Sequence, residues 1–271
     1  MPRPVITLLT DFGNADYFVG ALKGTILSLC RDAQIVDITH EVPPQDIAAG
    51  AFTLLAVYKS FPAQTVHIAV VDPGVGSARR PILATAAGQF FVGPDNGIFS
   101  YLWELDPPEQ VFHIQSQEFF RQPVSATFHG RDIFAPVAAA LANGVEPSRF
   151  GPEISDWVRL EPLSPVRAVD GLIHARVIHI DRFGNCVTNL TKEQVTDEMV
   201  ANGLQLSIKG REIHSFQTFF AEAGADQSEE VFAIWGSAGF LEIAAPAASA
   251  ARVLDVSTGQ RVVVSPAEEE R

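Results

Sequence analysis

Three polar residues, Asp72, Arg79 and His129, have side chains that together could activate a water molecule. Asp72 ends a nearly unbroken apolar run at residues 65–72, and the two glycines of the following loop, DPGVGSARR, allow a tight turn that returns Arg79 towards Asp72. His129 stands in FHGRD before an expected helix, and an imidazole with its ordinary pKa of about 6.5 can accept a proton from water at neutral pH. No serine or cysteine nucleophile motif accompanies the trio, so the sequence favours activated water over a covalent intermediate.

Each member of this trio also has a structural interpretation. Asp72 and Arg79 could form an ion pair whose only role is to hold the loop, and a single histidine often serves packing alone. The GxG pattern is weak evidence, and the lysine and hydroxyl residues of a phosphate-binding loop are absent. Asp132 is expected to cap the N-terminus of the helix after His129 and to have no catalytic role.

Two further aspartates follow expected strands in the same half of the chain. Asp11 comes after the apolar residues 5–9, and Asp95 comes after residues 89–93. Open α/β sheets bind ligands at the carboxyl ends of their strands, so Asp11, Asp72 and Asp95 are predicted to share a polar cleft. A role in a turn or a helix cap is the alternative for each.

The second half contains a turn, DRFGN, with the residue types that bind a nucleoside. The ring of Phe183 could stack on a base, Asn185 could read its hydrogen-bonding edge, and Asp181 could hold a cation. The alternative is a polar β-turn with one core phenylalanine. Residues 235–240, WGSAGF, are either a hairpin turn or a loop that closes over a ligand.

The elements that must position these residues alternate between strand and helix in the first half. Strands are expected at residues 5–9, 34–39, 65–72, 81–87 and 89–93, and helices at 17–30, 46–61, 98–103 and 132–144. This order predicts a layered α/β domain with a mostly parallel sheet over residues 1–165.

The second half is richer in short strands separated by glycine or polar turns. Strands are expected at residues 172–180, 204–208, 211–216, 230–235, 240–245, 251–256 and 261–265, and one helix at 191–200. Closely spaced short strands favour an antiparallel barrel or sandwich. Residues 166–271 are therefore predicted to form a smaller C-terminal β-barrel-like domain that binds the nucleoside.

Composition excludes several classes of protein. Hydrophobic residues make up 47% of the chain, which supports a full core, and the net charge of −13 argues against nucleic acid or an anionic membrane as partner. The two cysteines, Cys30 and Cys186, form no CxxC or Cys/His cluster, so no metal is expected. No signal-peptide pattern and no apolar run of about 18 residues occur, so a cytoplasmic location is expected.

The strings TDFG, DPGVGSARR, PDNG, FHGRD, DRFGN and GSAGFLEIA together closely resemble the S-adenosyl-L-methionine (SAM) hydroxide adenosyltransferase family. Members hydrolyse SAM and are related to the SAM-dependent fluorinase and chlorinase. The resemblance implies an N-terminal α/β domain, a C-terminal β-barrel-like domain and a homotrimer, with SAM between the N-terminal domain of one subunit and the C-terminal domain of its neighbour. SAM is then the substrate, and no cofactor is implied.

The same resemblance implies a role for each matching residue. Asp72, Arg79 and His129 match the hydrolase's Asp-Arg-His set. For the substrate it implies Asp11 at the ribose hydroxyls, Phe183 and Asn185 at adenine, Asp181 at the methionine ammonium, Ser237 at the methionine end, and Glu242 and the backbone around Ala245 at the nucleoside. One departure is Ala238, which stands where the halogenases have an arginine at the methionine carboxylate.

Residues and resemblance lead to one hypothesis, the in-line attack of activated water on C5′ of SAM to give adenosine and L-methionine. His129 is expected to be the base, Arg79 to stabilise the developing anion and Asp72 to orient the pair, although the final proton acceptor stays open. The leaving thioether is neutral, so neither a general acid nor a metal is required. Halide transfer to C5′ and a non-catalytic SAM or adenosine sensor are the alternatives.

Overall fold

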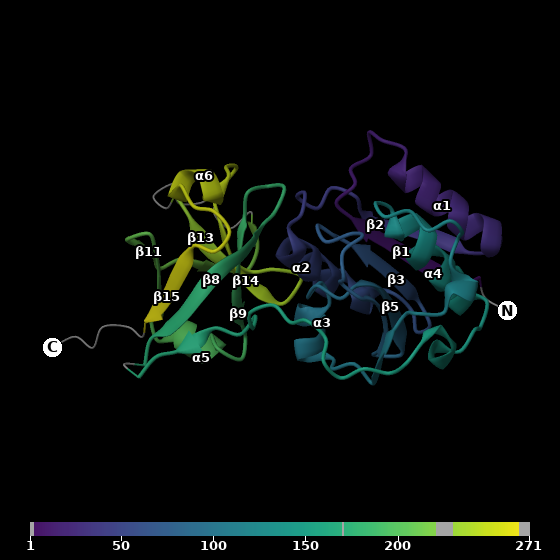
Figure 1. Ribbon diagram of the computed structural model, residues 1–271. Helices are drawn as coiled ribbons and strands as arrows, with labels where there is room; N and C mark the ends of the chain where they lie inside the picture. The colour runs from purple at the N-terminus through teal and green to yellow at the C-terminus, as the bar shows by residue number, and fades with distance from the viewer. Residues whose placement is uncertain (1–2, 170, 221–229, 266–271) are drawn as a thin grey trace. The chain divides into compact units, whose positions relative to one another are not determined.

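The chain divides into two compact units in the computed structural model, which describes residues 3–169, 171–220 and 230–265. The units are Met1–Pro162 and Leu163–Arg271, and each has its own sheet and its own buried core (Figure 1). The division lies in the proline-rich connector near which the sequence analysis placed a boundary, after residue 165.

The first unit is built on a six-stranded sheet that is parallel over four neighbouring strands and antiparallel at the remaining edge. Its strands, in spatial order, are β2 (Gln34–Thr39), β1 (Val5–Thr10), β3 (Val66–Val70), β5 (Gln89–Pro94), β4 (Pro81–Ala86) and β6 (Gln110–His113). β4 runs antiparallel to both β5 and β6. The predicted layered α/β fold with a mostly parallel sheet is confirmed, with β6 as a strand that the sequence analysis did not identify.

Helices cover both faces of this sheet. α1 (Phe18–Leu29) and α4 (Ala135–Ala142) pack together against one face (Figure 1). Ile6 and Leu8 of β1 belong to the core cluster on that face. α2 (Ile47–Val57) and α3 (Ser100–Leu105) pack on the opposite face, and Gly50 of α2 lies against Leu9. Short 3-10 turns lie at Tyr58–Ser60, Gln117–Phe119 and Pro147–Phe150, and one turn of π-helix, Gly130–Phe134, precedes α4. Among the described residues, no helix is long and apolar enough to cross a lipid bilayer.

The second unit is a curled, mostly antiparallel sheet around its own core. The strands, in spatial order, are β11 (Arg211–Ile213), β10 (Gln205–Ile208), β15 (Arg261–Ser265), β8 (Ile173–Ile180), β9 (Cys186–Thr191), β14 (Phe240–Ala244), β13 (Phe232–Trp235) and β12 (Phe216–Gln217), with β7 (Val166–Arg167) paired to β8. Among the described strands of this second sheet, only β12 and β13 pair in parallel. The predicted antiparallel, barrel-like character of this half is confirmed.

The strand predicted at residues 251–256 is wrong, because this segment forms helix α6 (Ala250–Leu254). Ser249 caps the helix by accepting a hydrogen bond from the Arg252 amide, and Asp255 ends it in the left-handed conformation. The helix predicted at residues 191–200 is shorter and begins later, as α5 (Asp197–Ala201), because Thr196 supplies its cap.

Candidate functional site

The loop after β3 returns Arg79 to Asp72, as the glycines in that loop predicted. Nε of Arg79 donates to both carboxylate oxygens, at 2.9 Å to Oδ1 and 3.0 Å to Oδ2, and Nη2 also donates to Oδ2. The Arg79 and Asp72 side chains are only 9% and 5% exposed. A charge-assisted pair held by several hydrogen bonds and largely shielded from water fixes the guanidinium in one orientation.

Gly76 allows this loop to pack against the segment that carries His129. Its φ of +77° is in the left-handed region, and a Cβ at this position would lie 2.2 Å from the carbonyl oxygen of Ala126. Within the loop, Ser77 Oγ donates to the carbonyl of Gly74 at 2.7 Å. Close backbone packing at Gly76 therefore sets the distance between the Arg79 loop and the His129 loop.

His129 lies within hydrogen-bonding distance of the same guanidinium, with 2.9 Å between its Nδ1 and Nη2 of Arg79. The guanidinium also lies 5.3 Å from the ring centre of Phe134, in the π-helical turn that follows His129. Burial, and then the charge of Arg79, lower the pKa of His129, while the charges of Asp72 and Asp132 oppose this. The ring is therefore neutral at neutral pH.

Asp132 does not cap a helix, and the prediction that it would is wrong. The residue at the cap position of α4 is Phe134, which makes no side-chain cap bond. The fully buried carboxylate of Asp132 instead accepts from the Ser125 amide at 2.8 Å and from Nε of Arg131 at 2.6 Å, and it pairs with Arg121 at 3.3 Å. Asp132 thereby closes the loop in which His129 stands.

A cavity of about 420 Å³ lies beside the trio. It is lined by residues of four loops of the first unit and of the elements next to them: Asp11, Phe12, Phe18, Gln45, Val70, Asp72, Pro73, Val75, Thr127, Phe128, His129 and Gly130. Asp11 is one of the lining residues, and its Oδ2 accepts a hydrogen bond from the backbone amide of Gln45 at 2.9 Å. The structure thus brings Asp11, Asp72 and His129 to one cavity.

The phenylalanine rings of this cavity form one packed cluster. The ring centres of Phe12 and Phe18 are 5.9 Å apart, and each lies within 6 Å of Phe128, in edge-on contacts. The Arg131 guanidinium lies 5.0 Å from the centre of the Phe128 ring and also pairs with Asp132. The apolar wall of the cavity and the loop that carries His129 are therefore one packed structure.

The prediction that Asp95 shares this cleft is wrong. Asp95 is 5% exposed, accepts from Nε of Arg80 at 2.8 Å and from the Val158 amide at 2.8 Å, and does not line the cavity. Arg80 also pairs with Asp156 at 2.8 Å. The consecutive arginines thus differ in their partners, because Arg79 binds Asp72 while Arg80 anchors the far end of the loop to β5.

In the second unit, the DRFGN turn is held by its own aspartate. Asp181 Oδ1 accepts from the amides of Phe183 and Asn185 at 2.9 and 2.8 Å, and Oδ2 accepts from the Asn185 side chain at 2.9 Å. Gly184 has a φ of +86° and packs so closely on Ser249 that a Cβ would lie 2.0 Å from its Oγ. The Phe183 ring is 78% exposed, so it is not the core phenylalanine of the alternative interpretation.

A second cavity, of about 660 Å³, opens beside this turn and the start of α6. Its described lining is Phe183, Asn185, Phe220, Ala245, Ala247, Ala248, Ser249 and Arg252. Three residues predicted for the nucleoside site, Phe183, Asn185 and Ala245, therefore meet at one cavity. The sequence interpretation does not include Ser249 and Arg252, because it predicts a strand at residues 251–256, although a serine before an alanine-rich run signals a helix cap.

The remaining predicted residues of this unit lie outside that lining. Ser237 is exposed in the turn between β13 and β14, where Gly236 N donates to Phe240 O at 2.9 Å, so residues 235–240 form a hairpin turn. Burial, and then the charge of Asp181, raise the pKa of Glu242. Asp181 and Glu242 are thus neighbouring carboxylates. Within the described ranges, no group of three metal-ligating side chains is assembled.

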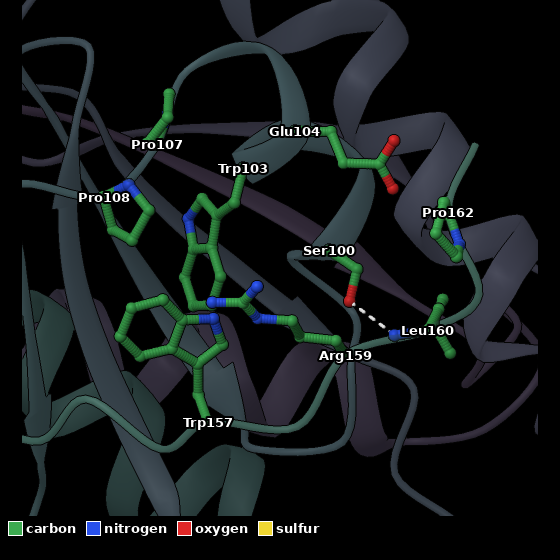
Figure 2. A pocket seen from close by; sticks show the side chains of 9 residues that line it. All are labelled: Ser100, Trp103, Glu104, Pro107, Pro108, Trp157, Arg159, Leu160 and Pro162. Atoms are coloured by element: carbon green, nitrogen blue, oxygen red, sulfur yellow. Dashed lines mark hydrogen bonds between the residues drawn. The ribbon is translucent and has the colours of Figure 1, made fainter. Parts of the chain in front are cut away.

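A third cavity, of about 550 Å³, lies in the first unit between α3 and the connector (Figure 2). The indoles of Trp103 and Trp157 are 5.4 Å apart at 75°, and Arg159 lies 5.3 Å from the Trp157 ring centre. Ser100 fixes the connector by accepting from the Leu160 amide at 2.9 Å. None of the residues predicted for the site from the sequence lines this cavity.

Comparisons with known proteins agree on one relationship over nearly the whole chain. Residues 6–151 match the SAM hydroxide adenosyltransferase N-terminal domain, and residues 175–263 match the C-terminal domain of that name. An (R)-S-adenosyl-L-methionine hydrolase of Methanocaldococcus jannaschii is 37% identical over 268 residues, which cover 93% of this chain and 92% of the relative. A fluorinase of Actinopolyspora mzabensis is 26% identical over 293 residues, with 97% of each chain covered.

A solved structure has the same fold. The crystal structure of an uncharacterized conserved protein from Thermotoga maritima superposes with a TM-score of 0.87 at 33% identity, covering 96% of this chain and 99% of that one.

Proposed function

Because the chain belongs to the SAM hydroxide adenosyltransferase family, we infer that it is an enzyme that hydrolyses SAM to adenosine and L-methionine. Both domains of the family are matched, and the relative at 37% identity over most of both chains is named a SAM hydrolase. The fluorinase relative is more distant, at 26% identity. SAM is the substrate, and the neutral thioether that leaves requires neither metal nor cofactor.

We propose that Asp72, Arg79 and His129 form the water-activating site. The observation that supports this most strongly is the hydrogen-bonded chain from Asp72 through Arg79 to His129 at the edge of the 420 Å³ cavity. The same chain disfavours halide transfer, because the Asp72 carboxylate lines the cavity and would repel a halide ion there. A site from which bulk water is largely excluded favours this reaction, because attack on a sulfonium disperses charge.

The substrate contacts are proposed on the same basis. Asp11 would bind the ribose hydroxyls, and Phe183, Asn185 and Ala245 would bind adenine, since these three line one cavity. Asp181 is proposed for the methionine ammonium, because its carboxylate can bind a cation, and Glu242, whose pKa is raised by burial and by the charge of Asp181, is proposed for the nucleoside. Ser237 is proposed for the methionine end.

We also propose a homotrimer, on the family resemblance, and a cytoplasmic location, as the sequence predicts. Measurement of the solution mass by light scattering tests the trimer, which predicts three times the mass of the chain.

Product analysis tests the function directly. Purified protein is incubated with SAM, with and without chloride, and the products are separated by chromatography. Adenosine and methionine in both samples are expected, whereas a nucleoside that appears only with chloride would show halide transfer. The sensor alternative predicts intact SAM throughout, and it also predicts that His129→Ala keeps its response to SAM. The enzyme should lose turnover in that variant and still bind SAM.

A further inference from the structure

The contact between Arg79 and His129 determines where the imidazole carries its hydrogen. A guanidinium has only N–H donors, so the 2.9 Å contact requires Nδ1 of His129 to accept with its lone pair. A neutral imidazole has one accepting nitrogen and one N–H. If Nδ1 accepts from Arg79, the hydrogen of the neutral ring is on Nε2.

The charges around the ring favour this neutral state. Burial and the Arg79 guanidinium lower the pKa of His129, and the carboxylates that face it, Asp72 and Asp132, only partly offset them. Asp132 is itself neutralised by Arg131 and Arg121. A protonated ring would carry a hydrogen on Nδ1 that points at an N–H of Arg79, so protonation would break the contact.

We propose that His129 donates a hydrogen bond from Nε2 to the attacking water and that Asp72, rather than His129, receives the proton of that water. This inference rests on the proposed function, because it assigns roles within the same site.

Asp72 is the member of the trio that keeps an available lone pair. Its Oδ2 receives two hydrogen bonds from Arg79, whereas Oδ1 receives one, at 2.9 Å, among the hydrogen bonds of the described residues. Arg79 has no acceptor, and the lone pair on Nδ1 of His129 is used by Arg79. Asp72 also lines the cavity directly, together with His129.

The step balances without a strong base. The oxygen of water forms a bond to C5′, the C5′–S bond breaks, and its electron pair goes to sulfur, which becomes the neutral thioether of methionine. The attacking oxygen gains positive charge as its new bond forms, so its proton becomes acidic and passes to the Asp72 carboxylate. A 5′-hydroxyl remains on adenosine, and Arg79 stays bound to Asp72 throughout.

The tautomer can be measured by nitrogen-15 NMR of the protein without SAM, so this test does not depend on activity. Protonated and unprotonated imidazole nitrogens resonate far apart, and the His129 signals are identified as those missing from His129→Gln. We expect an unprotonated Nδ1 and a protonated Nε2 at neutral pH. His67 is an internal reference with the same expected tautomer, because its Nε2 faces Oε1 of Gln89 at 3.2 Å while the Gln89 amide nitrogen donates to backbone carbonyls. A protonated Nδ1 in His129 would overturn the proposal.

Steady-state kinetics of variants test the proposed roles of His129 and Asp72 during turnover. His129→Gln keeps an N–H donor but has no base, so we expect its kcat to stay within about tenfold of the wild-type value. His129→Ala also lacks the donor, so its kcat should fall by about 10²-fold or more, which is the usual cost of removing an oriented hydrogen-bond donor. Asp72→Asn should lose at least as much as His129→Ala. His113→Gln is the matched control, since His113 lies outside the cavity lining, and it should be unchanged.

Two kinetic outcomes would also overturn the proposal: His129→Gln as inactive as His129→Ala, or Asp72→Asn with nearly full activity. If the wild-type protein leaves SAM intact while NMR shows a protonated Nε2 in His129, the proposed function is wrong but the assigned tautomer of His129 is correct.

Discussion

The variant Gly76→Ala tests whether backbone packing between the two loops sets the catalytic geometry. Gly76 has a φ of +77°, and an added Cβ would lie 2.2 Å from the carbonyl oxygen of Ala126 and 3.2 Å from its carbonyl carbon. Both neighbours are backbone atoms, so no side chain can rotate away to make room. The segment that leads to His129 must move, or the loop that carries Arg79 must move.

The size of the movement follows from these distances. Real Cβ contacts are essentially never below 3.0 Å, so one loop must retreat by about 0.8 Å from the 2.2 Å position. A displacement of about 1 Å in a catalytic group costs on the order of 10²-fold in rate. The left-handed φ adds a backbone strain of about 1 kcal/mol. This strain lowers the free energy of unfolding but does not by itself displace the catalytic residues. We therefore expect kcat to fall between about tenfold and 10²-fold.

Two glycine variants separate these effects. Gly144→Ala has a similar φ of +85° with nothing within 4 Å, so it should show the strain alone and keep full activity. Gly74→Ala lies in the same loop as Gly76, but its nearest contacts would be ordinary, at 3.4 Å, so it should affect kcat little. The assays are SAM hydrolysis and thermal unfolding. A Gly76→Ala enzyme with unchanged kcat, or a Gly144→Ala enzyme with an equal loss, would refute the packing argument.

Three further predictions concern protonation and the substrate. The kcat/KM for SAM should reach a plateau by neutral pH and fall on acidification, because a protonated His129 cannot accept from Arg79; a profile that rises towards pH 5 would contradict this. Burial lowers the pKa of His67 to about 4, so the protein should lose stability as the pH falls from 6.5 towards 4, by about 2 kcal/mol between pH 7 and pH 4.5 in urea unfolding. His67→Gln should lack this component, and an equal pH dependence in that variant would contradict it. Phe183→Ala should raise the KM for SAM about tenfold with little change in kcat or melting temperature, because the ring is 78% exposed and a stacked base is worth about 1–3 kcal/mol; an unchanged KM would remove Phe183 from the base site.

Parts of the site could be predicted from the sequence because their geometry is local. Asp72 and Arg79 are joined by one short loop, and its glycines allow the tight turn that returns the chain. The contact from Arg79 to His129 crosses 50 positions and depends on the packing of Gly76 against Ala126, which no local pattern encodes.

The errors also have physical causes. Asp95 follows a strand as Asp72 does, but its buried carboxylate pairs with Arg80 and does not line the cavity. Asp132 precedes a helix as a cap would, yet a π-helical turn inserts five residues, Gly130–Phe134, and leaves the carboxylate inside its own loop. The sequence does not predict helix α6, because the short, valine-containing segment ARVLDV resembles a strand, while Ser249 supplies a helix cap.

The most direct test of the account is to run the reaction with SAM in water labelled with oxygen-18 and to analyse the products by mass spectrometry. Attack of water on C5′ predicts one labelled oxygen in adenosine, at the 5′-hydroxyl, and unlabelled methionine. Adenosine without the label, or a label in the methionine product, would show that water does not attack C5′ and would contradict the account.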